Sequence, residues 1–309
     1  MRDETNIESS YIKEKKMLIQ LTQHIWYLPH DDETHRPALG FVSSGKNSLM
    51  IDSGNSPDHI AFFYGNTRSI GLPDPEFVAL THWHWDHIFG LSGSPAKSIA
   101  QQITNDRLQV MQRWDWSDNS LNSRVAAGLE IPFNADMIKK EMPIRHSFKI
   151  KIADISFMEE CFVRIEDIFC HLIHIGGPHS DDSVIVYIPS EKVLFVGDCC
   201  AGDPYSGNGI QLKLLSETLD KLNQFDADWF VPSHGDPQSK EDFMTSMRKV
   251  EKIGKIVGEL NTLEAAREAL KKEFKREPNE EEIESAQKFV NGNTIPPFQF
   301  SDKFLKEIN

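Results

Sequence analysis

Three histidines and one aspartate occur within six residues of the stretch VALTHWHWDHIFG, which covers residues 78–90. They are His82, His84, Asp86 and His87, in a chain of 309 residues that contains 12 histidines. Imidazole nitrogens and a carboxylate suit zinc, with bond lengths of about 2.0–2.2 Å. Residues two apart in an extended strand project the same way, so we expect His82 and His84 to hold one metal. Asp86 and His87, beyond a turn, would then face a second.

Two metals need more than four ligands, and three further candidates follow apolar strands later in the chain. His179 lies in the loop HIGGPHSDDS, Asp198 ends VLFVGD, and His234 lies in FVPSHGD. A rigid sheet presents a site through loops at the ends of its strands. These residues are therefore predicted to meet the first cluster.

The surrounding sequence predicts a layered α/β fold. Apolar stretches up to about residue 90 indicate strands, and a second run of strands is expected from FKIKI (148–152) to DWFVPSHG (228–235). A helix is expected over 216–225 and helical structure over 101–127. The stretch 114–147 shows only weak periodicity and is an excursion that could cover the site. Strands in two runs, separated and followed by helices, are typical of stacked layers.

The composition changes after Lys240. Apolar residues recur at three- and four-residue spacing from Phe243 to Leu260, which predicts a long amphipathic helix. Two more helices are expected around Pro278, which interrupts the pattern. We expect this helical region to pack on the strands, with a homodimer through its apolar stripe as the alternative.

Taken in order, HxHxDH, the histidine after Gly-Gly-Pro, the aspartate after LFVG and Ser-His-Gly resemble the metallo-β-lactamase superfamily. The resemblance covers roughly residues 17–240. It implies an αββα sandwich, in which two mixed β-sheets are flanked by helices. It also implies a catalytic domain at 17–240, with the helical and loop excursion at about 101–147, and a C-terminal helical region at 241–309.

The resemblance assigns a role to each matched position. His82, His84 and His179 correspond to the ligands of a first metal, Asp86, His87 and His234 to those of a second, and Asp198 to a bridging carboxylate. Asp52, in IDSG, corresponds to an aspartate that supports the site without binding metal. Two Zn²⁺ ions per chain and a bridging hydroxide are implied, with iron or manganese as other metals, and Asp86 is the catalytic residue that accepts a hydrogen bond from the hydroxide.

Two positions separate branches of the superfamily. True β-lactamases typically have cysteine where Asp198 stands, whereas glyoxalase II and the lactonases have the bridging carboxylate. Flavodiiron oxidoreductases typically have glutamate in place of His84. The resemblance therefore favours hydrolysis of a small ester, thioester or lactone. A phosphodiesterase and an iron-dependent redox enzyme, such as a sulfur dioxygenase, are the alternatives. Substrate contacts are expected from Tyr205, His30 and His35.

The net charge and composition indicate which kinds of binding partner and which cellular location to expect. The formal net charge is −14, which disfavours nucleic acid and anionic membranes, so a small-molecule substrate is expected. No apolar stretch approaches the length of a membrane span, and the N-terminus has no signal-peptide pattern. The four cysteines form no CxxC spacing, which is typical of a reducing compartment. We therefore expect a cytoplasmic protein.

Overall fold

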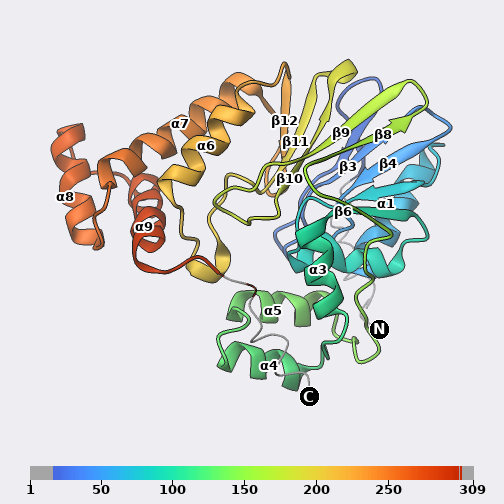
Figure 1. Cartoon of the computed structure of the whole chain (residues 1–309), viewed down its shortest axis with the longest axis horizontal. Helices are drawn as coiled ribbons and strands as arrows, with labels where there is room; N and C mark the ends of the chain where they lie inside the picture. The colour runs from blue at the N-terminus through green and yellow to red at the C-terminus, as the bar shows by residue number, and fades with distance from the viewer. Residues whose placement is uncertain (1–16, 299, 301–309) are drawn as a thin grey trace, which may run out of the picture.

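The computed structural model describes residues 17–298 and residue 300, and it contains two β-sheets packed between layers of helices (Figure 1). Strands β1 to β7 form the first sheet in chain order. Its first four strands pair antiparallel, and pairing is parallel from β4 to β7. The strands are β1 (Ile19–Gln20), β2 (Ile25–Leu28), β3 (Leu39–Ser43), β4 (Ser48–Ile51), β5 (Phe77–Ala79), β6 (Lys97–Gln101) and β7 (Ile155–Phe157).

The second sheet has the order β13-β12-β11-β10-β9-β8. Only β11 and β12 pair parallel in it, so both sheets are mixed. The predicted αββα sandwich is therefore confirmed. The strands are β8 (Glu160–Ile165), β9 (Ile168–His174), β10 (Val184–Ile188), β11 (Val193–Gly197), β12 (Trp229–Pro232) and β13 (Gln238–Ser239).

The central strands are buried on both faces, which explains their unalternated apolar sequences. Leu49 and Ile51 of β4 share an inter-sheet core with Val184 and Val186 of β10. Outer faces of the sheets pack against helices in two further apolar clusters. The helices near the first sheet are α1 (Pro57–Ser69), α2 (Trp85–Ile88), α3 (Gln102–Met111), α4 (Asp118–Ala126) and α5 (Pro132–Glu141), with a 3₁₀ turn at Phe89–Gly93.

The excursion after β6 contains three helices where the sequence predicted one helical stretch and an unassigned remainder. Helix α3 ends at Met111, and Ser117 caps α4 by accepting a hydrogen bond from the amide of Ser120. Arg145 closes the segment by donating to the carbonyl oxygens of Trp116 and Met142. Helices α4 and α5 lie together at one end of the sandwich (Figure 1).

The second sheet is covered by α6 (Leu212–Leu222) and α7 (Lys240–Val257), followed by α8 (Leu263–Phe274) and α9 (Glu280–Thr294) (Figure 1). Short 3₁₀ turns occur at Pro189–Glu191 and Pro204–Ser206. Phe243 of α7 packs against Phe230 of β12. Residues 301–309 of the predicted C-terminal region lie outside the described residues. Within the described part, no helix combines the length and apolarity that a bilayer crossing requires.

One predicted strand is wrong. FKIKI (148–152) forms no strand and joins neither sheet. Hydrogen bonds that involve side chains attach this segment and the residues after it to β6 and to Ala96, which precedes β6. Lys151 Nζ donates to the carbonyl of Ala96, and Asp154 accepts from the amide and hydroxyl of Ser98. Ile150 is buried, so the alternating pattern reflects packing without strand pairing.

Candidate metal centre

His82, His84 and His179 bring three ring nitrogens together. His82 Nε2 lies 3.0 Å from His84 Nδ1, which lies 2.9 Å from His179 Nε2, and the third side of the triangle is 3.2 Å. Strand β5 ends at Ala79, so the strand alternation invoked for His82 and His84 is wrong, although the rings converge. Four ligands about 2.05 Å from a tetrahedral ion lie about 3.3 Å apart. The triangle therefore suits one metal ion.

Asp86 lies beside both His87 and His234, but the ligand atoms gather as His35, Asp86 and His234 in one group and as His82, His87 and Asp198 in another. Asp86 and His87 lie on the single turn of α2, and His234 follows β12. Asp86 Oδ2 accepts a hydrogen bond from His234 Nε2 at 3.0 Å and lies 3.2 Å from His87 Nε2. His35 Nε2 lies 3.7 Å from Asp86 Oδ2, and its ring stacks on His234 at 4.2 Å.

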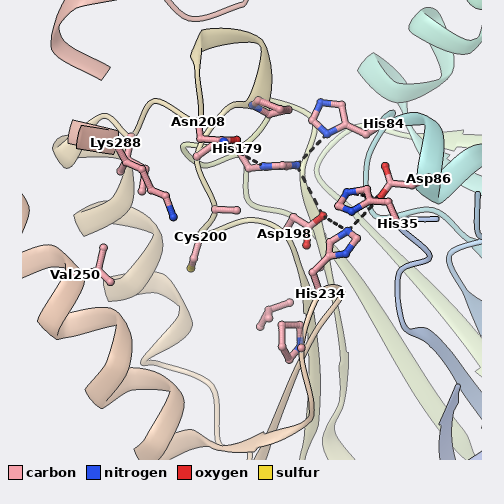
Figure 2. A pocket seen from close by; sticks show the side chains of 18 of the residues that line it. His35, His84, Asp86, His179, Asp198, Cys200, Asn208, His234, Val250 and Lys288 are labelled. Carbon is pink, nitrogen blue, oxygen red and sulfur yellow. Dashed lines mark hydrogen bonds and ion pairs between the residues drawn. The ribbon is translucent and has the colours of Figure 1, made fainter. Parts of the chain in front are cut away.

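Asp198 lies between the histidine triangle and His234. It follows β11, where Gly197 takes a left-handed conformation with φ 56°. Its Oδ2 lies 3.1 Å from His87 Nε2, 3.7 Å from His234 Nε2 and 3.8 Å from His179 Nε2. Figure 2 shows Asp198 among His84, Asp86, His179 and His234, with their polar ends turned toward one another.

Asp52 holds His87 from behind. It ends β4 with φ 59°, and its carboxylate accepts hydrogen bonds from the amide and hydroxyl of Thr81. Its Oδ2 lies 2.8 Å from His87 Nδ1. A contact between Nδ1 and a carboxylate oxygen orients the ring so that Nε2 faces the site. Asp52 thus buttresses the centre without facing it.

A second network joins the two loops that carry the histidine triangle. Ser180 Oγ accepts hydrogen bonds from Trp83 Nε1 at 3.1 Å and from Arg107 Nη1 at 3.3 Å, and donates to Asp182. Asp182 is fully buried and also accepts from Thr104 at 2.7 Å. Trp83 lies between His82 and His84, and Ser180 follows His179. The network therefore fixes the distance between the two loops.

The pKa shifts differ in direction between the histidines of the site. Burial holds the pKa of His82 and of His84 well below the usual histidine range, so both are neutral. Burial would raise the pKa of Asp86 and of Asp198, but the surrounding histidines outweigh it and lower both. Burial would lower the pKa of His87 and of His234, but the neighbouring carboxylates outweigh it and raise both. Neutral imidazoles and ionised carboxylates are the forms that bind metal, so a cation bound there would displace protons from these two rings. His87 Nε2 is buried without a hydrogen-bond partner among the described residues, although two carboxylate oxygens lie near it. A metal ion would satisfy it.

Comparison with known proteins agrees with this geometry. The family model for the metallo-beta-lactamase superfamily matches residues 39–234, which is more than half of the chain and includes every residue of the two groups except His35. The chain belongs to the metallo-β-lactamase superfamily. It is an enzyme of the hydrolase type found there, with histidine and aspartate groups able to bind divalent metal.

Individual relatives are distant. The chain is 22% identical over 222 residues to a linear primary-alkylsulfatase from a Pseudomonas species, covering 64% of this chain but only 41% of the sulfatase. It is 25% identical to the beta-lactamase-like protein 2 homolog of Drosophila melanogaster, covering 77% of this chain and 68% of that protein. Among solved structures, the metallo-beta-lactamase of Pontibacter korlensis is 17% identical with a TM-score of 0.53, over 75% of this chain and 98% of that one. DIM-1 metallo-beta-lactamase is 17% identical with a TM-score of 0.53, over 76% of this chain and 96% of that one. These structures share the fold.

Of the three predicted substrate residues, only His35 lines a cavity at the metal centre. Tyr205 donates to Glu130 at 3.2 Å and stacks on Trp83, and it is not among the residues that line that cavity. His30 is not among them either. Substrate contacts by these residues stay predictions.

The cavity has a volume of about 660 Å³ and extends from the metal centre to α7 and α9 (Figure 2). Most of the residues that line the cavity were not predicted from the sequence. Apolar spacing predicted that the α7 residues are buried, but spacing cannot show that a buried face borders a cavity. The missed lining residues include Trp85, Ile131, Phe133, Cys200, Asn208, Ile210, Phe243, Met247, Val250 and Lys288.

Proposed function

We propose that this protein is a dinuclear zinc hydrolase that uses a bridging hydroxide to cleave a small ester, thioester or lactone. His82, His84 and His179 would hold one zinc ion, and Asp86, His87 and His234 the other. The carrying observation is the place of Asp198, whose Oδ2 lies within 4 Å of histidines from both sets. A carboxylate in that position suits a bridge between two ions.

When bound, two zinc ions supply hydroxide at neutral pH by lowering the pKa of a shared water toward about 7, and they polarise the attacked carbonyl. The protein's own groups orient the reaction. Asp86 would accept a hydrogen bond from the nucleophile, and Asp52, which contacts His87 Nδ1, would fix the ring of His87. His35, stacked on His234 and half-buried, is placed to contact the substrate at the edge of the cavity.

Several features support this choice of substrate class. The aspartate at position 198 matches the bridging carboxylate of glyoxalase II and lactonases, and it argues against a true β-lactamase. One relative is named for acting on a linear primary alkyl sulfate, which is itself an ester. We therefore include sulfate esters in the class to be tested. We also propose that residues 17–240 form the catalytic domain and that the region after 240 completes its cavity.

The test combines metal content with hydrolysis. Protein purified without added metal is analysed for zinc, iron and manganese, then assayed with thioesters, lactones, carboxyl esters, alkyl sulfates and phosphodiesters. We expect about two zinc ions per chain and turnover of at least one carboxyl or sulfate ester, thioester or lactone. Asp198→Asn should lose the second zinc and turnover, whereas Asp226→Asn, at an exposed carboxylate, should keep both. Bound iron with oxygen consumption, or turnover of phosphodiesters alone, would overturn the proposal.

A further inference from the structure

The cavity is lined by polar and ionisable side chains at one end and by apolar side chains of α7 away from it. One end holds the histidines and carboxylates of the metal centre. Away from them, α7 contributes Phe243, Met247 and Val250, which follow one another at three- and four-residue spacing on one face of the helix. This wall offers no hydrogen-bonding group. A substrate that fills the cavity must therefore place an apolar part against α7.

Lys288 of α9 lies at the far end of this apolar wall. Among the described lining residues it is the only charged side chain outside the metal centre. Figure 2 shows its ammonium group turned from α9 toward the hollow bordered by Cys200 and Val250. The cavity thus has anion-binding chemistry at both ends, with the metal centre at one and a single ammonium at the other.

The present partner of Lys288 can be exchanged. Lys288 Nζ lies 2.9 Å from Glu284 Oε1, one helical turn away. The side chain of Glu284 is 70% exposed and does not line the cavity, whereas that of Lys288 is 34% exposed. An ion pair with so exposed a carboxylate contributes little, because water solvates both groups nearly as well. A substrate anion inside the cavity can compete with Glu284.

We infer that the substrate carries an apolar arm that ends in an anionic group, of the carboxylate type, which binds Lys288. The scissile ester, thioester or lactone lies at the metal centre, and the arm lies along α7. This inference rests on the proposed function for the identity of the scissile bond. The preference for an anionic terminus rests on the cavity alone.

The test compares ligands that differ only at the far end. Binding of octanoate and octanedioate to the purified protein is measured by calorimetry at equal ionic strength, with hexanoate and decanoate pairs to match the length of the cavity. Both acids offer the same carboxylate to the metal centre. The dicarboxylate should bind about fivefold more tightly, as expected of a half-exposed ion pair of roughly 1 kcal/mol.

Variants assign the difference to Lys288. Lys288→Met should remove the preference while keeping affinity for octanoate, and Glu284→Gln should increase the preference by freeing the ammonium. Lys213→Met is the matched control, because Lys213 also pairs with a glutamate one turn away, on α6, but is 86% exposed and outside the cavity. It should change nothing.

Equal affinity for the two acids at every chain length, or a preference that survives in Lys288→Met, would overturn the inference. The two proposals fail separately. Absence of zinc and hydrolysis refutes the proposed function while leaving the binding preference intact. Loss of the preference in an enzyme that contains zinc and hydrolyses esters refutes only the role of Lys288.

Discussion

Ser180→Ala tests whether the two loops of the histidine triangle are held by the network behind them. Ser180 Oγ joins three groups, because it accepts from Trp83 Nε1 and Arg107 Nη1 and donates to Asp182. The substitution removes the oxygen and touches no residue of the centre. Asp182 keeps its hydrogen bond from Thr104, so its carboxylate is not left unpaired.

The expected loss can be worked from these contacts. A hydrogen bond to a charged group contributes about 1.5–3 kcal/mol, and a buried donor left without a partner, here Trp83 Nε1, costs about 1–3 kcal/mol. These terms overlap, so we expect the free energy of unfolding to fall by about 2–4 kcal/mol. The loops that carry His84 and His179 then lose their shared anchor. Supporting groups of this kind change metal affinity by about 10–100-fold.

The assay is a zinc competition titration with a chromophoric chelator, together with urea unfolding of the same samples. Ser216→Ala is the matched control, because Ser216 also donates a hydrogen bond to a buried carboxylate, Glu251, but lies between α6 and α7. It should lower stability by about 1.5–3 kcal/mol and leave zinc affinity unchanged. Equal zinc affinity in the two variants would show that the loops do not depend on Ser180.

Three further predictions concern other parts of the molecule. Asp52→Asn can turn an amide donor toward His87 Nδ1, favouring the tautomer with its proton on Nε2, so zinc affinity should fall about 10–100-fold in the same titration while circular dichroism stays unchanged. Burial would raise the pKa of Glu251, but Ser216, Lys255 and Arg248 outweigh it and hold the pKa at about 2, below the usual 4.5. That stability is present above pH 4.5 and is lost as the pH falls through 2, so Glu251→Gln should flatten the acid side of an unfolding curve measured against pH. Chelation of metal should lower the melting temperature in calorimetry without unfolding the protein, because ligand binding at 1,000 times Kd adds only about 4 kcal/mol.

Local pattern predicted a layered α/β fold and candidate ligands at strand ends, whereas the αββα sandwich was implied by the resemblance to the superfamily. His82, His179, Asp198 and His234 each follow a strand, and strand ends in a sandwich meet at one edge. The unalternated apolar strands required burial on both faces, and hence helices outside the sheets. These are properties of local pattern and chain order.

The walls of the cavity could not be predicted in the same way. Met247 of α7 and Lys288 of α9 border the same hollow through the packing of helices, which no local pattern encodes. In the segment FKIKI, the alternating pattern correctly indicated a buried residue, Ile150, but wrongly predicted a strand. His35 was predicted as a substrate contact, but its stacking on His234, on a left-handed backbone with φ 58°, could not be predicted from its sequence neighbours.

The centre draws its groups from both sheets. Loops of the first sheet bring His82, His84, Asp86 and His87, and loops of the second bring His179, Asp198 and His234. A metal bound there would join groups from the two sheets at one edge of the sandwich. The inter-sheet core already joins the sheets, and each fully buried aliphatic side chain in it contributes about 1.5–3 kcal/mol. We therefore expect the sandwich to position the ligands before metal arrives. Asp52 and Ser180, which hold the spacing of the site, are then expected to affect metal affinity, and Ser180 to affect stability as well.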